Sequence, residues 1–176
     1  MKQETFLWQL GGVTFTAIIG TLLHFLYDWT GLALFAPISA VNESTWEHMK
    51  ILFFPMLFFA VLQAFFFRQA QPNFCWIKLV GISVGVLLVP ILFYTINGAF
   101  GKTPDWVNIS IFFLSAFVSF LVEYLLFKQN QTPFSSPILP IRLLLFFATT
   151  FIWFTYSPPN IPLFLDPVTK KYGIVK

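Results

Sequence analysis

Five long stretches of the sequence consist almost entirely of apolar residues. A helix needs about 20 such residues to cross a hydrocarbon core of ~30 Å, and each stretch is long enough or nearly so. Gly, Pro and Asn interrupt the sequence between them, where helices should end. The predicted spans are residues 6–27, 49–67, 76–97, 106–127 and 138–156. The pattern therefore predicts an all-α fold, an integral membrane bundle of about five transmembrane helices in one domain over residues 1–157.

The last segment, residues 158–176, has a different pattern. Its prolines, which include Pro158, Pro162 and Pro167, prevent a sixth long helix in so short a stretch. Apolar residues such as Phe164 lie between them, so the composition is not that of a disordered tail. Two arrangements fit this pattern. The tail either lies across one face of the bundle as a lid or rests loosely at the membrane interface.

The composition excludes a soluble domain. The chain is 57% hydrophobic and 10% charged, whereas soluble domains carry about 25% charged residues. The lipid bilayer is therefore the expected surroundings of the chain. The formal net charge of +3 comes from basic residues scattered along the sequence, which argues against a nucleic acid partner. The single cysteine, Cys75, rules out an intramolecular disulfide.

Basic residues near the ends of the spans predict the orientation, because they favour the cytoplasmic side. Most of them fall on the side of the N-terminus, whereas Lys50 and Lys102 fall on the other side. We therefore predict a multi-pass protein of the cell membrane with a cytoplasmic N-terminus. Lys170, Lys171 and Lys176 in the tail count against this orientation. The basic residues on the N-terminal side are Lys2, Arg68, Lys78, Lys128 and Arg142.

Small residues recur at intervals of four in three of the spans. This spacing is typical of helices that approach closely in lipid, where packing replaces the hydrophobic effect. Three such stripes together predict a packed bundle. They are Gly12, Thr16 and Gly20 in the first span, Gly81 and Gly85 in the third, and Ser115 and Ser119 in the fourth.

The stripe on the first span continues to two ionisable residues, His24 and Asp28. Steps of four residues rotate only about 40° around a helix, so both side chains are expected to face neighbouring helices. Ionisable groups at such depth are costly and are usually paired or functional. In a functional pair, Asp28 would accept a hydrogen bond from His24 and fix its tautomer. The alternative is an interfacial pair with a structural role only.

The densest polar segment, residues 42–48, lies just before the second span. Ser44 and Glu47 match a capping box, in which the two side chains bind free amide groups at the start of a helix. An acidic residue at this end also suits the helix dipole. Capping leaves Glu43 and His48 without an explanation.

These polar residues supply two imidazoles and three carboxylates at one membrane face. Nitrogen and oxygen ligands of this kind suit zinc, manganese or iron, and a bound metal could activate water or hold a lipid phosphate. The segment has no strong ligand motif, so capping remains the competing explanation for its acidic residues. We assign His24, Asp28 and His48 as candidate metal ligands, and Glu43 and Glu47 as candidate catalytic residues.

Two segments carry a resemblance to a known family. They are HFLYDW at His24–Trp29 and VNESTWEHMK at Val41–Lys50. Both resemble a bacterial family of small multi-span membrane proteins, a domain of unknown function. The tail around Asp166–Gly173 is consistent with the same family. The resemblance implies a membrane location. It also implies that the face with His24 and Glu47 distinguishes this family from others, but it implies no activity.

Three classes of function fit the sequence, which does not decide whether the protein is an enzyme. The favoured class is a non-catalytic membrane scaffold or partner subunit, in which the polar segment serves structure alone. The second is a membrane-embedded, metal-dependent hydrolase or transferase with a polar site at the outer face. The third is a small transporter or channel subunit, which would need to oligomerise because five spans are few. The expected partners are accordingly a lipid or small-ion ligand, a second copy, or another membrane protein.

Overall fold

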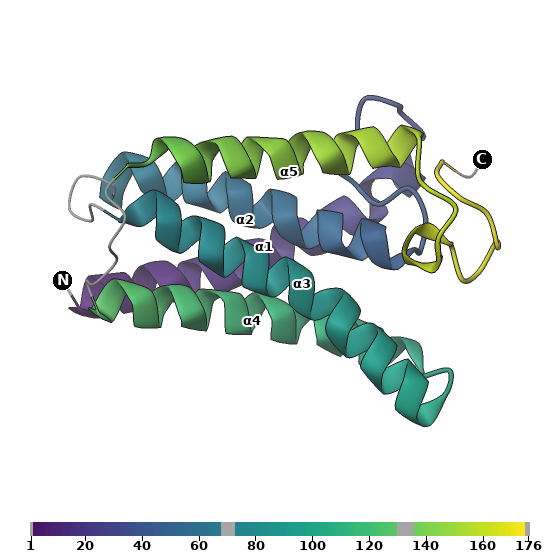
Figure 1. Ribbon diagram of the computed structural model, residues 1–176, viewed down its shortest axis with the longest axis horizontal. Helices are drawn as coiled ribbons and strands as arrows, with labels where there is room; N and C mark the ends of the chain where they lie inside the picture. Colours follow the sequence, from purple (N-terminus) through teal and green to yellow (C-terminus); the bar gives the residue numbers. More distant parts are fainter. Residues whose placement is uncertain (1, 68–72, 130–135, 175–176) are drawn as a thin grey trace.

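The computed structural model describes residues 2–67, 73–129 and 136–174. Its five long helices run roughly along the long axis of the molecule (Figure 1). Each is long and apolar enough to cross a membrane, which confirms the predicted all-α membrane bundle. The helices are α1 (Lys2–Thr30), α2 (Thr45–Phe67), α3 (Phe74–Phe100), α4 (Asp105–Gln129) and α5 (Ile138–Tyr156).

Most of the helices extend beyond the predicted spans at one or both ends. Hydropathy detects only the apolar middle of a helix, so polar terminal turns such as the first turn of α2 are missed. Gly31 and Gly101 follow the ends of α1 and α3 with φ of 63° and 77°. Glycine adopts this left-handed conformation without strain and so ends a helix readily. Arg68, which we used to predict the orientation, lies outside the described residues.

The first four helices form a closed ring, in which α1 and α3 each contact both α2 and α4. Helix α5 packs on the outside, against α2 and α3 (Figure 1). Two glycines of α1 fix its register against its neighbours, because a side chain at either position would overlap an aromatic ring. Gly12 lies against Phe59 and Phe120, and Gly20 lies against Ile51 and Phe112.

The small residues of α3 and α4 face each other. Gly81 lies against the side chain of Glu123, and Gly85 lies against Ser119. The Ser119 hydroxyl also donates a hydrogen bond to the Gly81 carbonyl. The predicted small-residue stripes therefore lie at helix contacts, and they allow α3 and α4 to approach closely.

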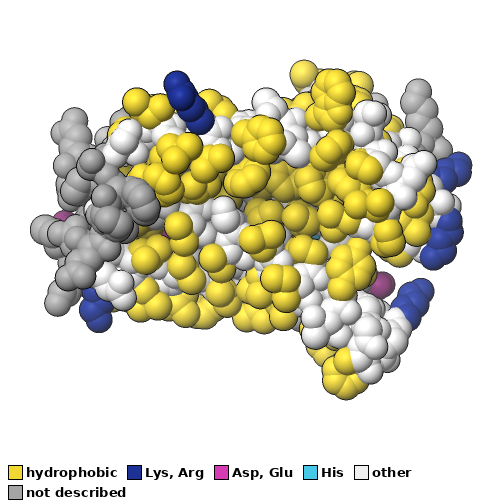
Figure 2. All heavy atoms as spheres, in the orientation of Figure 1, with side chains coloured by type: hydrophobic (Ala, Val, Ile, Leu, Met, Phe, Trp, Pro, Cys, Tyr) yellow, Lys and Arg dark blue, Asp and Glu magenta, His cyan; other side chains and the backbone are white. Residues whose placement is uncertain are grey.

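The outer surface of the bundle is mostly apolar. Large side chains in the middle of the helices are exposed, among them Leu87 of α3, Phe117 of α4 and Leu145 of α5. The space-filling view shows hydrophobic side chains along the length of the molecule, with most charged side chains toward its two ends (Figure 2). Such a surface suits a bilayer core rather than water.

A buried ion pair joins α3 to α4. The Lys78 ammonium lies 2.5 Å from a carboxylate oxygen of Glu123, and the two side chains are only 2% and 0% exposed. Lys78, which we used to predict the orientation, is thus buried between helices, and the side of the N-terminus stays a prediction. Four aromatic rings surround the ammonium at 5.5–5.8 Å from their centroids, those of Phe59, Phe74, Phe120 and Phe127.

The tail packs against one end of the bundle, which we call the loop face because it also carries the α1–α2 loop, residues 31–44. A short 3-10 helix, Pro162–Phe164, buries the Phe164 ring 4.6 Å from the ring centre of Trp46. Leu165 and Tyr172 then form an antiparallel bridge. The tail is thus a folded segment against the loop face (Figure 1), which agrees with the lid arrangement and not with the loose one.

Removing one partner of the α3–α4 ion pair should destabilise the bundle strongly. We expect Glu123→Leu to lower the free energy of unfolding by about 3–5 kcal/mol, because it leaves a buried ammonium unpaired. The double substitution Lys78→Met/Glu123→Leu should recover most of this loss, since it removes both charges. Denaturant titration in detergent micelles would measure both effects. The exposed Lys102→Met provides the control, and an equal loss in the single and double variants would contradict the role given to the pair.

Candidate metal centre

Three polar side chains converge at the loop face from three parts of the chain. His24 lies toward the C-terminal end of α1, Glu43 in the loop, and His48 in the first turn of α2. One candidate ligand atom from each lies within 4.8 Å of those from the other two. The antiparallel packing of α1 on α2 produces this cluster, because it places the end of one helix beside the start of the next.

Glu43 lies between the two imidazoles. One of its carboxylate oxygens is 3.7 Å from His24 Nε2, and the other is 3.7 Å from His48 Nε2. These distances are too long for hydrogen bonds. Ligand atoms around a tetrahedral zinc lie about 3.3–3.5 Å apart, given bond lengths of about 2.0–2.2 Å. The two Glu43 contacts exceed this spacing by a few tenths of an ångström, and the ligand atoms of the whole group lie within 4.8 Å of one another, so the three side chains would have to move closer together to bind zinc.

The orientation of His48 suits a metal ligand. Its Nδ1 lies 2.9 Å from the Ser44 carbonyl oxygen. Because a carbonyl only accepts hydrogen bonds, Nδ1 carries a proton, and Nε2 faces Glu43. Metal-binding histidines commonly use a backbone carbonyl in this way to fix the tautomer and the ring plane.

Asp28 does not join this cluster. Its side chain is exposed, and the metal-binding group found among the described residues consists of His24, Glu43 and His48. Nor does it form the expected hydrogen bond with His24, whose Nδ1 is buried without a partner in the described part of the chain. Asp28 lies one helical turn after His24, and its side chain is exposed rather than packed against a neighbouring helix. Its assignment as a metal ligand stays a prediction, without support from this geometry.

Glu47 binds other groups. Its carboxylate lies 2.5 Å from the Lys50 ammonium and accepts a 3.0 Å hydrogen bond from the Val41 amide. Lys50 donates in turn to the Ala36 carbonyl at 3.0 Å and to the Thr155 hydroxyl at 2.8 Å. Through these hydrogen bonds the pair links α2 to the loop and to α5. These contacts give Glu47 a structural role, and its assignment as a catalytic residue stays a prediction.

Only half of the predicted capping box forms. The Ser44 hydroxyl accepts a hydrogen bond from the Glu47 amide at 3.4 Å. The reciprocal bond from Ser44 N goes to Asn42 Oδ1 at 2.8 Å instead of to the Glu47 carboxylate. Local sequence spacing predicted the box, whereas the Glu47 carboxylate binds Lys50, three residues further along α2, and the Val41 amide.

The tail holds the loop in place. Asn42 Nδ2 donates a 2.7 Å hydrogen bond to the Gly173 carbonyl, while its Oδ1 accepts from Ser44. Both polar atoms of the Asn42 amide are thus used, and the residue that follows it is Glu43. The tail therefore fixes the backbone that carries the carboxylate of the cluster.

Our sequence analysis did not single out Asn108. The register of α1 against α4 pairs Gly12 with Phe120 and Gly20 with Phe112, so the next step of four brings Asn108 to the level of His24. Its Oδ1 is buried without a hydrogen-bond partner in the described ranges. The sequence signal was an amide near the start of an apolar span, which becomes informative only once the helix register is known.

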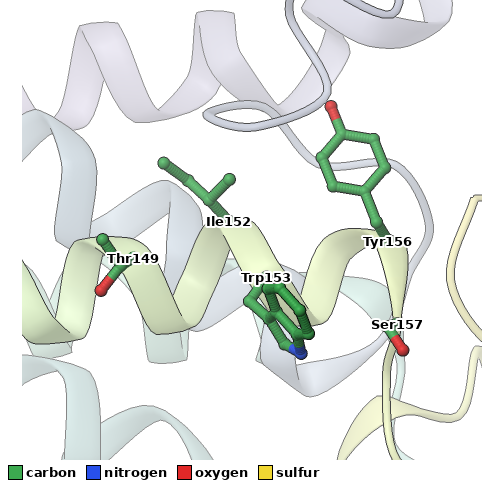
Figure 3. A pocket seen from close by; sticks show the side chains of 5 residues that line it. All are labelled: Thr149, Ile152, Trp153, Tyr156 and Ser157. Atoms are coloured by element: carbon green, nitrogen blue, oxygen red, sulfur yellow. The ribbon is translucent and has the colours of Figure 1, made fainter.

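A shallow apolar hollow lies elsewhere, on α5. The residues that line it include none of the three clustered residues. Figure 3 shows the lining side chains on the C-terminal turns of α5. Nothing in its lining offers charged or metal-binding groups. The lining residues are Thr149, Ile152, Trp153, Tyr156 and Ser157.

Five helices that are long and apolar enough to cross a membrane, four in a ring and one packed outside it, define a multi-span membrane protein. The sequence profile of a family of unknown function, DUF6512, matches residues 1–174, and the chain belongs to this family. This confirms the resemblance drawn from the segments around His24 and Glu47. No curated protein and no solved structure matches the chain.

Removing the Ser44 cap should weaken the start of α2. We expect Ser44→Ala to lower the free energy of unfolding by about 1 kcal/mol, because the Glu47 amide loses its partner. Denaturant titration in micelles measures this effect, with the exposed Ser110→Ala of α4 as the control. Equal stability of the two variants would contradict a capping role.

Proposed function

We propose that this protein is a membrane-embedded, metal-dependent hydrolase whose site lies at the loop face. The observation that carries the proposal is the convergence of His24, Glu43 and His48, with ligand atoms within 4.8 Å of one another. Two imidazoles and one carboxylate form a ligand set used by catalytic zinc, which activates a bound water for attack on an ester or amide. Zinc is therefore the first metal to test, before manganese and iron.

The number and exposure of the ligands favour catalysis over a structural metal. Structural zinc sites are usually closed by four protein ligands, whereas catalytic sites have three and leave a position for water or substrate. Here the cluster has three ligands, and the Glu43 side chain is 45% exposed. A substrate held at the membrane surface could reach such a site, beside the exposed Trp29 and Phe25 of α1.

Two other functions are less well supported. Transporters usually bind their substrate near the middle of the membrane, whereas this cluster lies where α1 approaches its end and α2 begins. A purely structural scaffold explains the polar contacts of Glu47 and Ser44. In such a scaffold the two imidazoles would serve only as ion-pair partners of Glu43, and their convergence on a half-exposed carboxylate would have no chemical role.

The proposal predicts one bound metal ion per chain. After removal of metals and incubation with zinc, the detergent-purified protein should retain near-stoichiometric zinc in elemental mass spectrometry. The double variant His24→Ala/His48→Ala should lose it, because only one ligand would remain. Competition with a coloured zinc indicator would give the affinity of Glu43→Gln relative to the unchanged chain.

A matched control separates a site from adventitious binding to surface acids. Asp105→Asn removes an exposed carboxylate at the start of α4 and should leave the zinc content unchanged. Equal zinc content in the unchanged chain and the folded double histidine variant would refute the metal site. It would leave the scaffold as the better explanation.

The zinc-loaded protein should hydrolyse an amphiphile presented in vesicles. We expect turnover in a panel of carboxylic esters and phosphoesters with acyl chains, and its loss in Glu43→Gln, in His48→Ala and after chelation. Product release measured by mass spectrometry would test this, with Asp105→Asn as the active control. Stoichiometric zinc without turnover of any amphiphile in the panel would count against the hydrolase but would still support the metal site.

A further inference from the structure

Two glutamines are buried in the bundle without hydrogen-bond partners. Gln9 of α1 is 4% exposed and Gln63 of α2 is 0% exposed. Neither the amide nitrogen nor the amide oxygen of either side chain has a partner in the described ranges. The carboxylate oxygen of Glu123 that does not bind Lys78, Oε1, is buried and unpartnered as well. Buried polar side chains are nearly always hydrogen-bonded, so five such atoms call for an explanation.

The helix register brings these three side chains to one level. Gln9 lies three residues before Gly12, whereas Glu123 lies three residues after Phe120, the residue that contacts Gly12. Since α1 and α4 are antiparallel, both steps lead in the same direction and keep to the same helix faces. Gln63 lies one turn beyond Phe59 in that direction. All three therefore occupy one layer of the bundle, about one helical turn from the Gly12 contact.

The ion pair of α3 and α4 belongs to the same layer. Lys78 binds one oxygen of the Glu123 carboxylate and leaves Oε1 unpaired. The ammonium lies 5.6 Å from the centre of the Phe59 ring and 5.5 Å from that of Phe120. Aromatic rings thus border a layer whose polar groups face inward, away from lipid.

The mixture of atoms indicates the kind of ligand. The glutamines offer N–H donors and carbonyl acceptors, and Glu123 adds a further acceptor. A cation would leave the N–H groups unsatisfied, and an anion would leave the oxygens unsatisfied. The charges of Lys78 and Glu123 already balance, so the layer needs no ion. Water, which both donates and accepts, satisfies all of these groups.

We propose that this layer binds ordered water molecules that link Gln9, Gln63 and the free oxygen of Glu123. Such water completes the hydrogen bonding of the carboxylate and keeps a charged pair solvated inside an apolar bundle. This internal site is separate from the cluster at the loop face and does not rest on the proposed function.

Hydroxyl-radical footprinting of the full chain in micelles tests the proposal. Brief X-ray irradiation forms radicals from water, including water bound inside a protein, and these radicals label adjacent side chains. Phe59, Phe120 and Phe53 are all nearly fully buried, at 4%, 1% and 1% exposure. Phe59 and Phe120 should be labelled severalfold more than Phe53, which packs in an aromatic cluster with Phe54 and Phe151.

The double variant Gln9→Leu/Gln63→Leu should lower the labelling of Phe59 and Phe120 to that of Phe53. The exposed Thr149→Val of α5 serves as the control and should leave the pattern unchanged. Equal, low labelling of all three phenylalanines in the unchanged chain would overturn the proposal, and this comparison holds even if the double variant fails to fold. High labelling that persists in a folded double variant would overturn it too.

Discussion

Two ammonium groups buried in an apolar bundle determine how its helices can pack. Lipid supplies no hydrogen bonds, so each ammonium must find its partner inside the protein. Lys78 finds Glu123 across the α3–α4 contact, and Lys50 finds Glu47 together with Ala36 of the loop. A shift of α3 along α4 by one turn would separate the first pair. The Lys78–Glu123 pair thus selects a single register of α3 against α4, whereas Glu47 and Lys50, which both belong to α2, link this helix to the loop through Val41 and Ala36.

Local rules were sufficient to predict the elements. The length and hydropathy of the spans gave five helices, and the prolines correctly excluded a sixth long one. The small residues correctly marked the α3–α4 contact, because close approach requires a missing side chain at Gly81 and Gly85. These features depend on residues near one another in the sequence, which is why a sequence pattern is enough to find them.

The pairing of Lys78 with Glu123, 45 residues apart, could not be predicted in the same way, whereas Glu47 and Lys50 lie three residues apart in α2. We counted Lys78 and Lys50 among the residues that indicate orientation, since a residue's position in the sequence does not show which neighbouring helix its side chain faces. The candidate site was anticipated in part. His24, Glu43 and His48 come together, whereas Asp28 points away and Glu47 binds Lys50. Asn108 and the buried glutamines required the helix register, which only tertiary packing defines.

The hydrogen bond between Asn42 and Gly173 has a consequence for biosynthesis. The two residues are separated by 131 positions, and four of the helices lie between them in the sequence. A membrane protein is made and inserted from its N-terminus, so the loop with Glu43 reaches its face of the membrane long before Gly173 leaves the ribosome. The hydrogen bond from Asn42 to Gly173 therefore forms only after α5 has been made, so the loop that carries Glu43 gains this contact late in biosynthesis.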